Sequence, residues 1–343
     1  MDDRKNIYTI AKELNLSPST ISKALNNTGS INEMTRQRVL NYIKDVGYVP
    51  TASARKLKSK RSYTIGVIFT EESNVGLEHS FFSSILQNFK TYIENKGYEL
   101  AFIVTKLGQH QMSYYEWCLN KRVDGIYIVV GNYQDKGLYE LVGKGIPCVS
   151  TDMILSGIHT VISDNEQGVS LVLNYIKDHL KKTEIAVISG PKSSKAFEER
   201  VTLCKTIGQT LGFNLVDEKI EFAESFGFTS GYQGAKRLLS RLDHLPEVLF
   251  VTSDDLALGV IKYLEDQKID IPGQVQVIGF DDIAFARHFT PPLTTIRQDK
   301  TNLGMTAGKL LIDLIEQPEL HIPTIHKCPV ELVIRETTQE AAQ

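Results

Sequence analysis

From residue 63 onward, short apolar runs alternate with amphipathic segments, and this alternation restricts the possible folds more than any other feature of the sequence. The apolar runs, each four to six residues long, lie at 64–69, 100–104, 125–130, 147–150, 185–189, 248–252 and 275–279. Segments with apolar residues at helical spacing separate them, at 82–96, 167–181, 229–241 and 256–266. Short buried strands that alternate with helices are typical of α/β folds with parallel sheets and crossover helices.

The number of these runs exceeds the strands of one typical sheet, so we expect two α/β lobes. A polar break at 160–164 suits a first passage of the chain between the lobes, and the proline-containing stretch 291–298 suits a second. We therefore expect one lobe to contain about 63–161 and 293–322, and the other to contain about 162–292 and 323–343.

Composition places the chain among globular proteins. Of the 343 residues, 42% are hydrophobic and 23% are charged, which is enough apolar material for sizeable cores. The four cysteines lie far apart without C-x-x-C spacing, so we expect neither a disulfide scaffold nor a metal site. Residues 1–6 carry charges of both signs and lead into no apolar signal segment, and no run approaches the about 18 apolar residues of a membrane span. We expect a cytoplasmic protein with no membrane partner.

Charge is distributed unevenly along the chain. Residues 1–62 hold twelve lysines and arginines against five acids, a net charge of +7, so the remainder of a chain whose total is -3 carries -10. A basic segment joined to an acidic body predicts a polyanion-binding module attached to a domain with another task. On charge alone, a solvated basic surface remains the alternative.

The basic segment contains the pattern of three short helices. Thr9 can cap a helix over 10–14, and Ser17 can cap a second helix that has Pro18 at its first position. A third helix is predicted over 32–46, with Asn32 as its cap and Gly47 at its end. Two short helices joined by a tight turn, with a third to complete a small core, predict a helix-turn-helix.

The second of these helices exposes an unusual set of side chains. Its outer face carries only small polar or basic residues, namely Ser19, Thr20, Ser22, Lys23 and Asn26. No acid occurs between residues 14 and 33, whereas a merely solvated helix normally mixes glutamate with lysine. Such a face can approach phosphates closely and place side chains against base edges in the major groove of DNA. The sequence therefore predicts a DNA-binding head.

Four runs in this head carry a resemblance to a known family: YTIA at 8–11, LSPSTISKALN at 16–26, TRQRV at 35–39 and GYVP at 47–50. The pattern resembles the LacI/GalR family of bacterial transcription regulators, and the resemblance extends over essentially the whole chain. It implies a helix-turn-helix DNA-binding domain at 1–50, a hinge helix at 51–62, and an effector-binding and dimerisation core at 63–343, similar to periplasmic sugar-binding proteins.

The resemblance also implies roles for residues of the head. Pro18, Ser19 and Lys23 match the positions that read bases, and because proline has no N–H to donate, direct readout should rest on Ser19 and Lys23. The residues implied to contact mainly the DNA backbone are Tyr8, Ser17, Thr20, Ser22 and Asn26.

The segment 51–62 is basic and has too little apolar surface to fold alone. The resemblance implies a hinge helix that orders on operator DNA, contacts it through Ala54, Leu57 and Lys58, and pushes Leu57 into the minor groove. The alternative is that Leu57 packs on the body of the protein.

Candidate effector-binding residues follow the predicted strands, because ligands of parallel α/β sheets bind beyond the carboxyl ends of the strands. Asp164, Asp254 and Asp281 lie there, although each aspartate could equally cap the next helix. The resemblance implies that Asp281 and Arg200 contact a sugar and that Phe82 and Phe226 flank it, with core packing as the alternative for both phenylalanines. Ser253 stands where many relatives have asparagine, so the polar contacts of the effector are expected to differ.

No catalytic or cofactor-binding motif of the G-x-S-x-G, H-E-x-x-H or G-x-G-x-x-G type occurs, so we expect neither an enzyme nor a cofactor. Three functions remain: a ligand-controlled DNA-binding regulator, a solute-binding protein, and a sugar-processing enzyme with a DNA-binding head. We expect the first, a repressor that pairs as a homodimer on a pseudo-palindromic operator and responds to a small molecule, most plausibly a carbohydrate. Residues 336–343 show no leucine heptad, which favours a dimer over a tetramer.

Overall fold

The computed structural model describes residues 6–25, 29–48, 61–69, 76–320 and 322–341. The chain divides into two compact units, Met1–Ser62 and Tyr63–Gln343. The predictions for Asn26, Ala54, Leu57 and Lys58 lie outside the described residues.

The first unit contains three helices, α1 (Ile7–Leu14), α2 (Pro18–Leu25) and α3 (Glu33–Asp45). Their apolar faces meet in one small core, which is formed by Ile10, Ala11, Leu14, Ile21, Ala24, Val39 and Ile43. The predicted helix-turn-helix is confirmed. The predicted cap of α1 is wrong: Asn6 accepts hydrogen bonds from the Tyr8 and Thr9 amides, and Thr9 lies inside the first turn, where its hydroxyl accepts one from the Asn6 amide.

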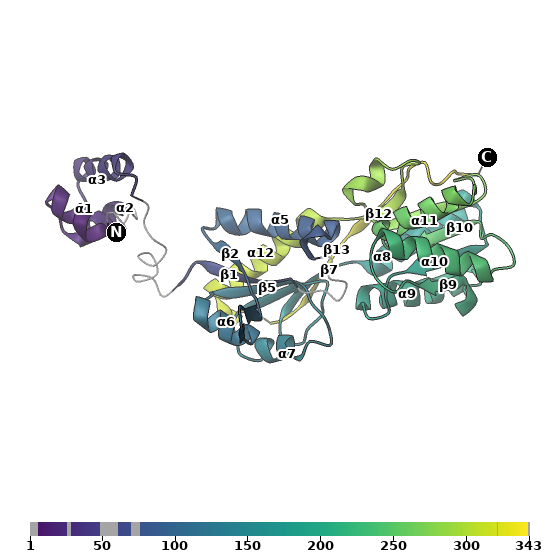
Figure 1. Ribbon diagram of the computed structural model, residues 1–343, viewed down its shortest axis with the longest axis horizontal. Helices are drawn as coiled ribbons and strands as arrows, with labels where there is room; N and C mark the ends of the chain where they lie inside the picture. The colour runs from purple at the N-terminus through teal and green to yellow at the C-terminus, as the bar shows by residue number, and fades with distance from the viewer. Residues whose placement is uncertain (1–5, 26–28, 49–60, 70–75, 321, 342–343) are drawn as a thin grey trace. The chain divides into compact units, whose positions relative to one another are not determined.

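The second unit holds two six-stranded sheets, one in each lobe (Figure 1). The sheet of the first lobe is parallel throughout, in the order β13 (Ile325–Cys328), β7 (His159–Ser163), β6 (Cys148–Thr151), β5 (Gly125–Val130), β1 (Thr64–Phe69) and β2 (Glu99–Phe102). Helices α5 (Ser80–Asn95) and α12 (Lys300–Glu316) cover one face, and α6 (Tyr114–Lys121) and α7 (Lys136–Val142) cover the other. A two-stranded ribbon, β3 (Lys106–Leu107) with β4 (His110–Gln111), follows β2.

The sheet of the second lobe has the order β14 (Val330–Val333), β12 (Thr294–Gln298), β11 (Gln276–Asp281), β10 (Val248–Val251), β8 (Ile185–Ser189) and β9 (Ile220–Phe222). Only the β12–β14 pair is antiparallel. Helix α8 (Asn165–Tyr175), continued by η2 (Ile176–Leu180), and α9 (Lys195–Leu211) cover one face, and α10 (Phe228–Arg241) and α11 (Asp254–Asp266) cover the other. Short helical turns lie at η1 (Gly76–Glu78), η3 (Asp217–Lys219), η4 (Ala284–Arg287) and η5 (Pro318–Leu320).

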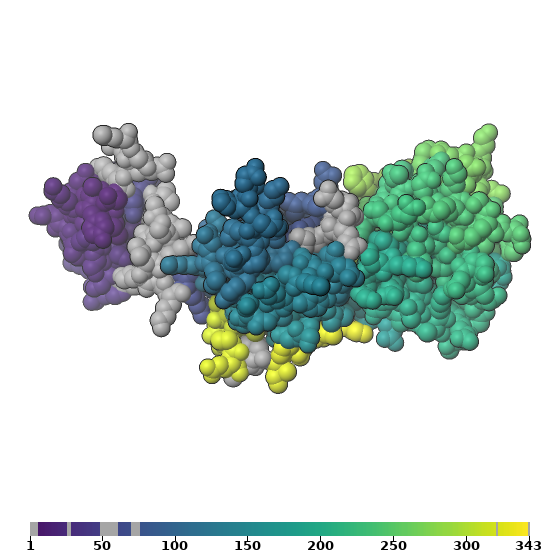
Figure 2. All heavy atoms as spheres, turned by 60° about the horizontal axis from the view of Figure 1, so that its bottom comes forward, coloured from purple at the N-terminus to yellow at the C-terminus, as the bar shows by residue number. Residues whose placement is uncertain are grey.

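Within residues 76–320 and 322–341 the chain passes between the lobes after β7, after β12 and after β13. The expected lobe boundaries are therefore wrong by one strand at each end of α12. Strand β12 pairs with β11 of the second lobe, so the passage falls at Asp299, which caps α12 by accepting a hydrogen bond from Asn302. Strand β13 pairs with β7 and so belongs to the first lobe. Figure 2 shows the yellow part of the chain against the teal atoms of that lobe.

The prediction of parallel sheets with crossover helices is confirmed. The runs 64–69, 125–130 and 185–189 coincide residue for residue with β1, β5 and β8, because each is apolar and buried on both faces of its sheet. Among the helices of the described residues, none has the length and apolarity needed to span a bilayer.

Candidate functional site

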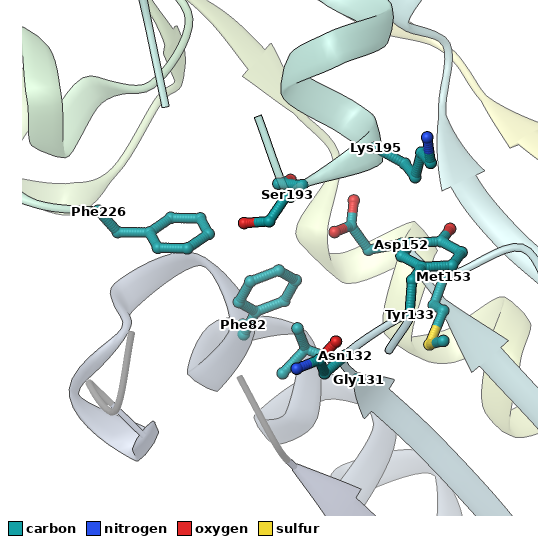
Figure 3. A pocket seen from close by; sticks show the side chains of 11 residues that line it. Phe82, Gly131, Asn132, Tyr133, Asp152, Met153, Ser193, Lys195 and Phe226 are labelled. Atoms are coloured by element: carbon teal, nitrogen blue, oxygen red, sulfur yellow. The ribbon is translucent and has the colours of Figure 1, made fainter. Parts of the chain in front are cut away.

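A cleft lies between the two lobes, at the carboxyl ends of strands β5, β6 and β8 (Figure 3). It encloses about 510 Å³, part of which is open to solvent. Its lining comes from both lobes: Phe82, Val130, Gly131, Asn132, Tyr133, Asp152 and Met153 from the first, and Ser193, Ser194, Lys195 and Phe226 from the second. Strand ends that meet in this way are the usual place for a ligand of a parallel α/β protein.

Two aromatic rings from opposite lobes face the cleft. Phe82 lies in the first turn of α5, and Phe226 lies just before α10. The Phe82 ring also packs edge-on against Phe81, at a centroid distance of 5.1 Å, and belongs to the core of the first lobe. Both predicted phenylalanines thus line one cleft, and Phe82 serves in core packing as well.

The first lobe presents polar groups with few protein partners. Asp152 follows β6 with φ 61°, and in Figure 3 its carboxylate points toward the same space as the Ser193 hydroxyl and the rings of Phe82 and Phe226. Burial raises the pKa of Asp152, which the positive charge of Arg200 counteracts. Tyr133 accepts a hydrogen bond from the Ile154 amide at 2.9 Å, and burial raises its pKa to about 12.

In the second lobe, Arg200 on α9 is only 3% exposed, and its guanidinium group contacts several other groups of the same lobe. Its Nε donates to Asn165 Oδ1 at 2.9 Å, and its Nη1 donates to the Thr252 carbonyl at 2.7 Å. The same Nη1 lies 4.0 Å from Asp281 Oδ1, and the guanidinium carbon lies 3.8 Å from the centre of the Phe280 ring. These contacts supply the charge compensation that a buried guanidinium needs.

Asp281 ends β11 in a left-handed conformation, with φ 130°. Its carboxylate accepts hydrogen bonds from Ser253 Oγ at 3.0 Å and from Gln298 Nε2, and Lys300 Nζ donates to its carbonyl oxygen. Burial raises the pKa of Asp281, whereas Arg200 and Lys300 oppose the rise. The structure thus brings together the predicted residues Arg200, Ser253 and Asp281.

Asp254 is fully buried beside this group. Its carboxylate accepts hydrogen bonds from the Ile283 amide at 2.9 Å and from the Thr295 hydroxyl. Position 279 must be glycine, because a Cβ there would lie 2.2 Å from Asp254 Oδ1. Burial, aided by the negative charge of Asp281, raises the pKa of Asp254 to about 8.

Asp164 is a helix cap, the alternative role that the sequence allowed for it. It caps α8 by accepting a hydrogen bond from the Gln167 amide at 3.0 Å. Among the described residues that line the cleft, Asp164 does not occur.

Sequence reasoning missed Tyr133 and Asp152. Both follow predicted strands, 125–130 and 147–150, so the same strand-end rule that selected Asp164 could have selected them.

The face of α2 in the first unit is the second candidate site. Ser17, Pro18, Ser19 and Lys23 are exposed, Thr20 and Ser22 are half-buried, and Tyr8 of α1 is 71% exposed. Ser17 Oγ accepts a hydrogen bond from the Thr20 amide at 3.1 Å and lies 2.8 Å from the Thr20 hydroxyl, so it acts as the cap of α2. The described part of α2 contains no acid.

Comparison with known proteins matches both units to family models. Residues 6–51 match the model "Bacterial regulatory proteins, lacI family", and residues 179–338 match the periplasmic binding protein-like domain.

Relatives that align over nearly the whole chain support the same family. The transcriptional repressor PurR of Vibrio vulnificus (strain CMCP6) is 31% identical over 339 residues, which cover 97% of this chain and 98% of that protein. The ribose operon repressor of Escherichia coli (strain K12) is 30% identical, over 94% and 96% of the two chains. The solved structure of the lac repressor dimer bound to operator and the anti-inducer ONPF has a TM-score of 0.83 at 24% identity, over 98% of this chain and 99% of that one. These relatives are repressors and not enzymes, which confirms the expectation drawn from the missing catalytic motifs.

Proposed function

Because the chain belongs to the lacI family of bacterial regulatory proteins, we propose that it is a repressor whose affinity for operator DNA is set by a small molecule held between the lobes. The observation that carries the proposal is the cleft itself, where aromatic rings from both lobes face a carboxylate and a hydroxyl. In this proposal 1–50 binds DNA, 51–62 forms the hinge, and 63–343 binds the effector and pairs with a second chain.

On the DNA side, the exposed face of α2 supports the proposed contacts. Lys23 and Ser19 are exposed and free of acidic neighbours on their helix, as side chains that reach base edges must be. Tyr8, Ser17, Thr20 and Ser22 would contact the DNA backbone. Asn26, Ala54, Leu57 and Lys58 keep the roles that the resemblance implies.

We assign a carbohydrate as the effector. Sugar hydroxyls can donate to the Asp152 carboxylate while Phe82 and Phe226 cover the apolar faces of the ring. Arg200, Ser253, Asp254 and Asp281 lie behind this surface, where their mutual bonds fix the wall of the second lobe. The relatives named above are a ribose operon repressor and the repressor PurR, and we keep a purine as the competing class of effector.

A homodimer follows from the same reasoning. A helix-turn-helix protein reads a pseudo-palindrome with two heads related by two-fold symmetry. The lac repressor structure of the same fold is a dimer on its operator. Sedimentation of the full chain should give twice the monomer mass of 38.5 kDa, and a monomeric chain bound to operator would contradict this part of the proposal.

A two-stage experiment tests the function. Thermal shift with a panel of pentoses, hexoses, disaccharides, sugar acids, sugar phosphates and purines identifies the effector class. Fluorescence anisotropy with an operator selected from a randomised DNA pool then measures the affinity with and without each compound that binds. We expect a sugar to raise the melting temperature and to change the operator affinity. Binding of purines alone would overturn the carbohydrate assignment, and no selectable operator would overturn the repressor.

A further inference from the structure

His79 stands at the start of α5, where the two lobes face each other. Its ring lies 4.7 Å from the Phe82 ring and 5.8 Å from the Phe226 ring, centroid to centroid, so it contacts cleft-lining aromatic rings of both lobes. The side chain is 8% exposed. Neither the motifs nor the strand-end rule pointed to this residue.

The imidazole of His79 does not cap the helix that it precedes. His79 occupies the cap position of α5 but makes no side-chain capping bond there. Serine, threonine, aspartate and asparagine are the residues that stabilise such a position, and histidine is not among them. The local structure therefore gives no reason for a histidine at 79.

The Nδ1 atom of His79 is buried without a hydrogen-bond partner among the residues that the structure describes. A buried polar atom that stays unpaired destabilises a fold, so such atoms call for a specific explanation. In a binding cleft the explanation is a ligand that completes the hydrogen bond.

Acidic groups of both lobes interact electrostatically with His79, namely Asp152 of the first lobe and Asp255 and Asp281 of the second. An imidazole nitrogen can donate or accept a hydrogen bond according to the tautomer of the ring, so a ligand atom of either kind can complete the bond at Nδ1.

We propose that His79 is a specificity-determining residue whose Nδ1 forms a hydrogen bond with a polar atom of the effector. The effector is then a molecule that presents hydroxyl donors toward Asp152 and a polar oxygen or nitrogen atom toward the start of α5. This inference rests on the proposed function, since it requires that a small molecule occupies the cleft.

The test compares two substitutions of His79 in the full chain. His79→Ser removes the imidazole and supplies a good helix cap, so the ligand-free protein should melt at or above the wild-type temperature, by up to about 4 °C. The same variant should bind the probe that shifts the wild type, D-ribose, D-glucose or cellobiose, about 10-fold more weakly or worse. His79→Asn also caps the helix but keeps a side-chain amide, which can donate or accept, near the Nδ1 position, and should retain affinity within about 3-fold. The exposed His288→Phe serves as the control and should change neither quantity.

The proposal is overturned if His79→Ser leaves the affinity of the probe unchanged, whatever its melting temperature. It is overturned as well if the serine variant melts lower than the wild type and the asparagine variant recovers stability and affinity in parallel, since His79 would then be a packing residue. If none of these sugars shifts the wild-type protein, the carbohydrate assignment fails separately, and the affinities are compared for the compound of the panel that does shift it. A His79→Ser variant that binds that compound as tightly as the wild type overturns the proposal, and weaker binding supports it.

Discussion

The two walls of the cleft differ in how their polar groups are bonded. Behind the second-lobe wall lie Arg200, Ser253, Asp254 and Asp281, which are not among the described cleft-lining residues and whose side chains already have partners in the protein. The first-lobe wall includes Phe82, Tyr133 and Asp152, and His79 packs against the Phe82 ring with its Nδ1 unpartnered among the described residues. Groups that are already bonded to each other fix a shape, whereas open groups remain for a ligand to bind.

This difference bears on whether Arg200 and Asp281, the pair predicted to contact a sugar, bind the effector or stabilise the second lobe. Arg200 and Asp281 were expected to grip the effector directly, yet both are at most 4% exposed and hold each other in place. Removal of one member of a buried ion pair leaves the other charge uncompensated. We therefore predict that substitutions in the second-lobe wall act mainly on stability and that substitutions in the first-lobe wall act mainly on binding. The predictions below begin with the largest expected loss in the free energy of unfolding and end with substitutions that should cause little or no loss.

Arg200→Met should lower the free energy of unfolding by about 3–5 kcal/mol, because it strips Asp281 of its guanidinium partner in a buried setting. Urea denaturation of the full chain measures this. Lys195→Met is the matched control: Lys195 pairs with Glu198 at the surface, and its loss should cost less than about 1 kcal/mol. An Arg200→Met variant as stable as the Lys195→Met control would contradict the claim that Arg200 mainly stabilises the second lobe.

Asp281→Asn should cost about 1.5–3 kcal/mol, because an amide cannot accept from both Ser253 and Gln298 and carries no charge opposite Arg200. Asparagine has nearly the same shape as aspartate and would keep the same backbone at φ 130°, so the loss reports mainly the side-chain bonds. If the Asp281→Asn variant unfolds in urea like the wild type but has lost its affinity for the sugar, Asp281 contacts the effector directly and our assignment is wrong.

Asp254→Asn should change stability by less than about 1 kcal/mol near pH 4, because the native carboxyl group, whose pKa is raised to about 8, is neutral there, and an amide can accept from the Ile283 amide while its NH2 group donates to the Thr295 hydroxyl oxygen. A folded-state pKa above the unfolded value means that the native state binds the extra proton. The wild type therefore loses stability as the pH rises from about 4 to about 8, with a slope of up to about 1.4 kcal/mol per unit.

The asparagine variant should lack this contribution, so the difference between the two proteins grows in favour of the variant from about pH 4 to about pH 8 and stays constant above pH 8. Urea unfolding of both proteins at intervals from pH 5 to pH 9 gives the comparison. Parallel pH profiles would show that Asp254 is ionised throughout this range.

Asp152→Asn should leave the free energy of unfolding within about 0.5 kcal/mol, because Asp152 is partly exposed and asparagine accepts its φ of 61° readily. Calorimetry with the sugar that binds the wild type should show about 10-fold weaker binding, since the charged acceptor for sugar hydroxyls is gone. If Asp152→Asn lost as much stability as we expect for Asp281→Asn, Asp152 would also have a structural role, and the proposed difference between the two lobes would be wrong.

The sequence predicted the fold where burial leaves a clear pattern and failed where it does not. Strands β1, β5 and β8 are continuous apolar runs, whereas β12 reads TTIRQ, and its threonines are buried because Thr295 binds Asp254 and Thr294 binds Thr338. A polar strand of this kind carries no hydrophobic signal, so the second passage between the lobes was misplaced. The cap of α1 was misassigned because Asn6 and Thr9 are both good caps, and only the folded backbone distinguishes them.

The candidate site was predicted in part for a related reason. Resemblance located Phe82, Arg200, Phe226 and Asp281, but the residues of the cleft that stay open to a ligand are defined by which partners the fold leaves unbonded. His79 has an unpartnered Nδ1 and lies near Phe226 of the other lobe, and no local sequence pattern encodes that approach.

The central claim is that the cleft and the DNA-binding head share one coupling free energy. Calorimetry gives the affinity of the sugar for the free protein and for the saturated operator complex, and anisotropy gives the affinity of the operator with and without saturating sugar. Linkage requires the two ratios to be equal, and a regulator of this kind predicts a common value of about 5- to 150-fold. A sugar that binds the cleft while both ratios remain at one would contradict the account.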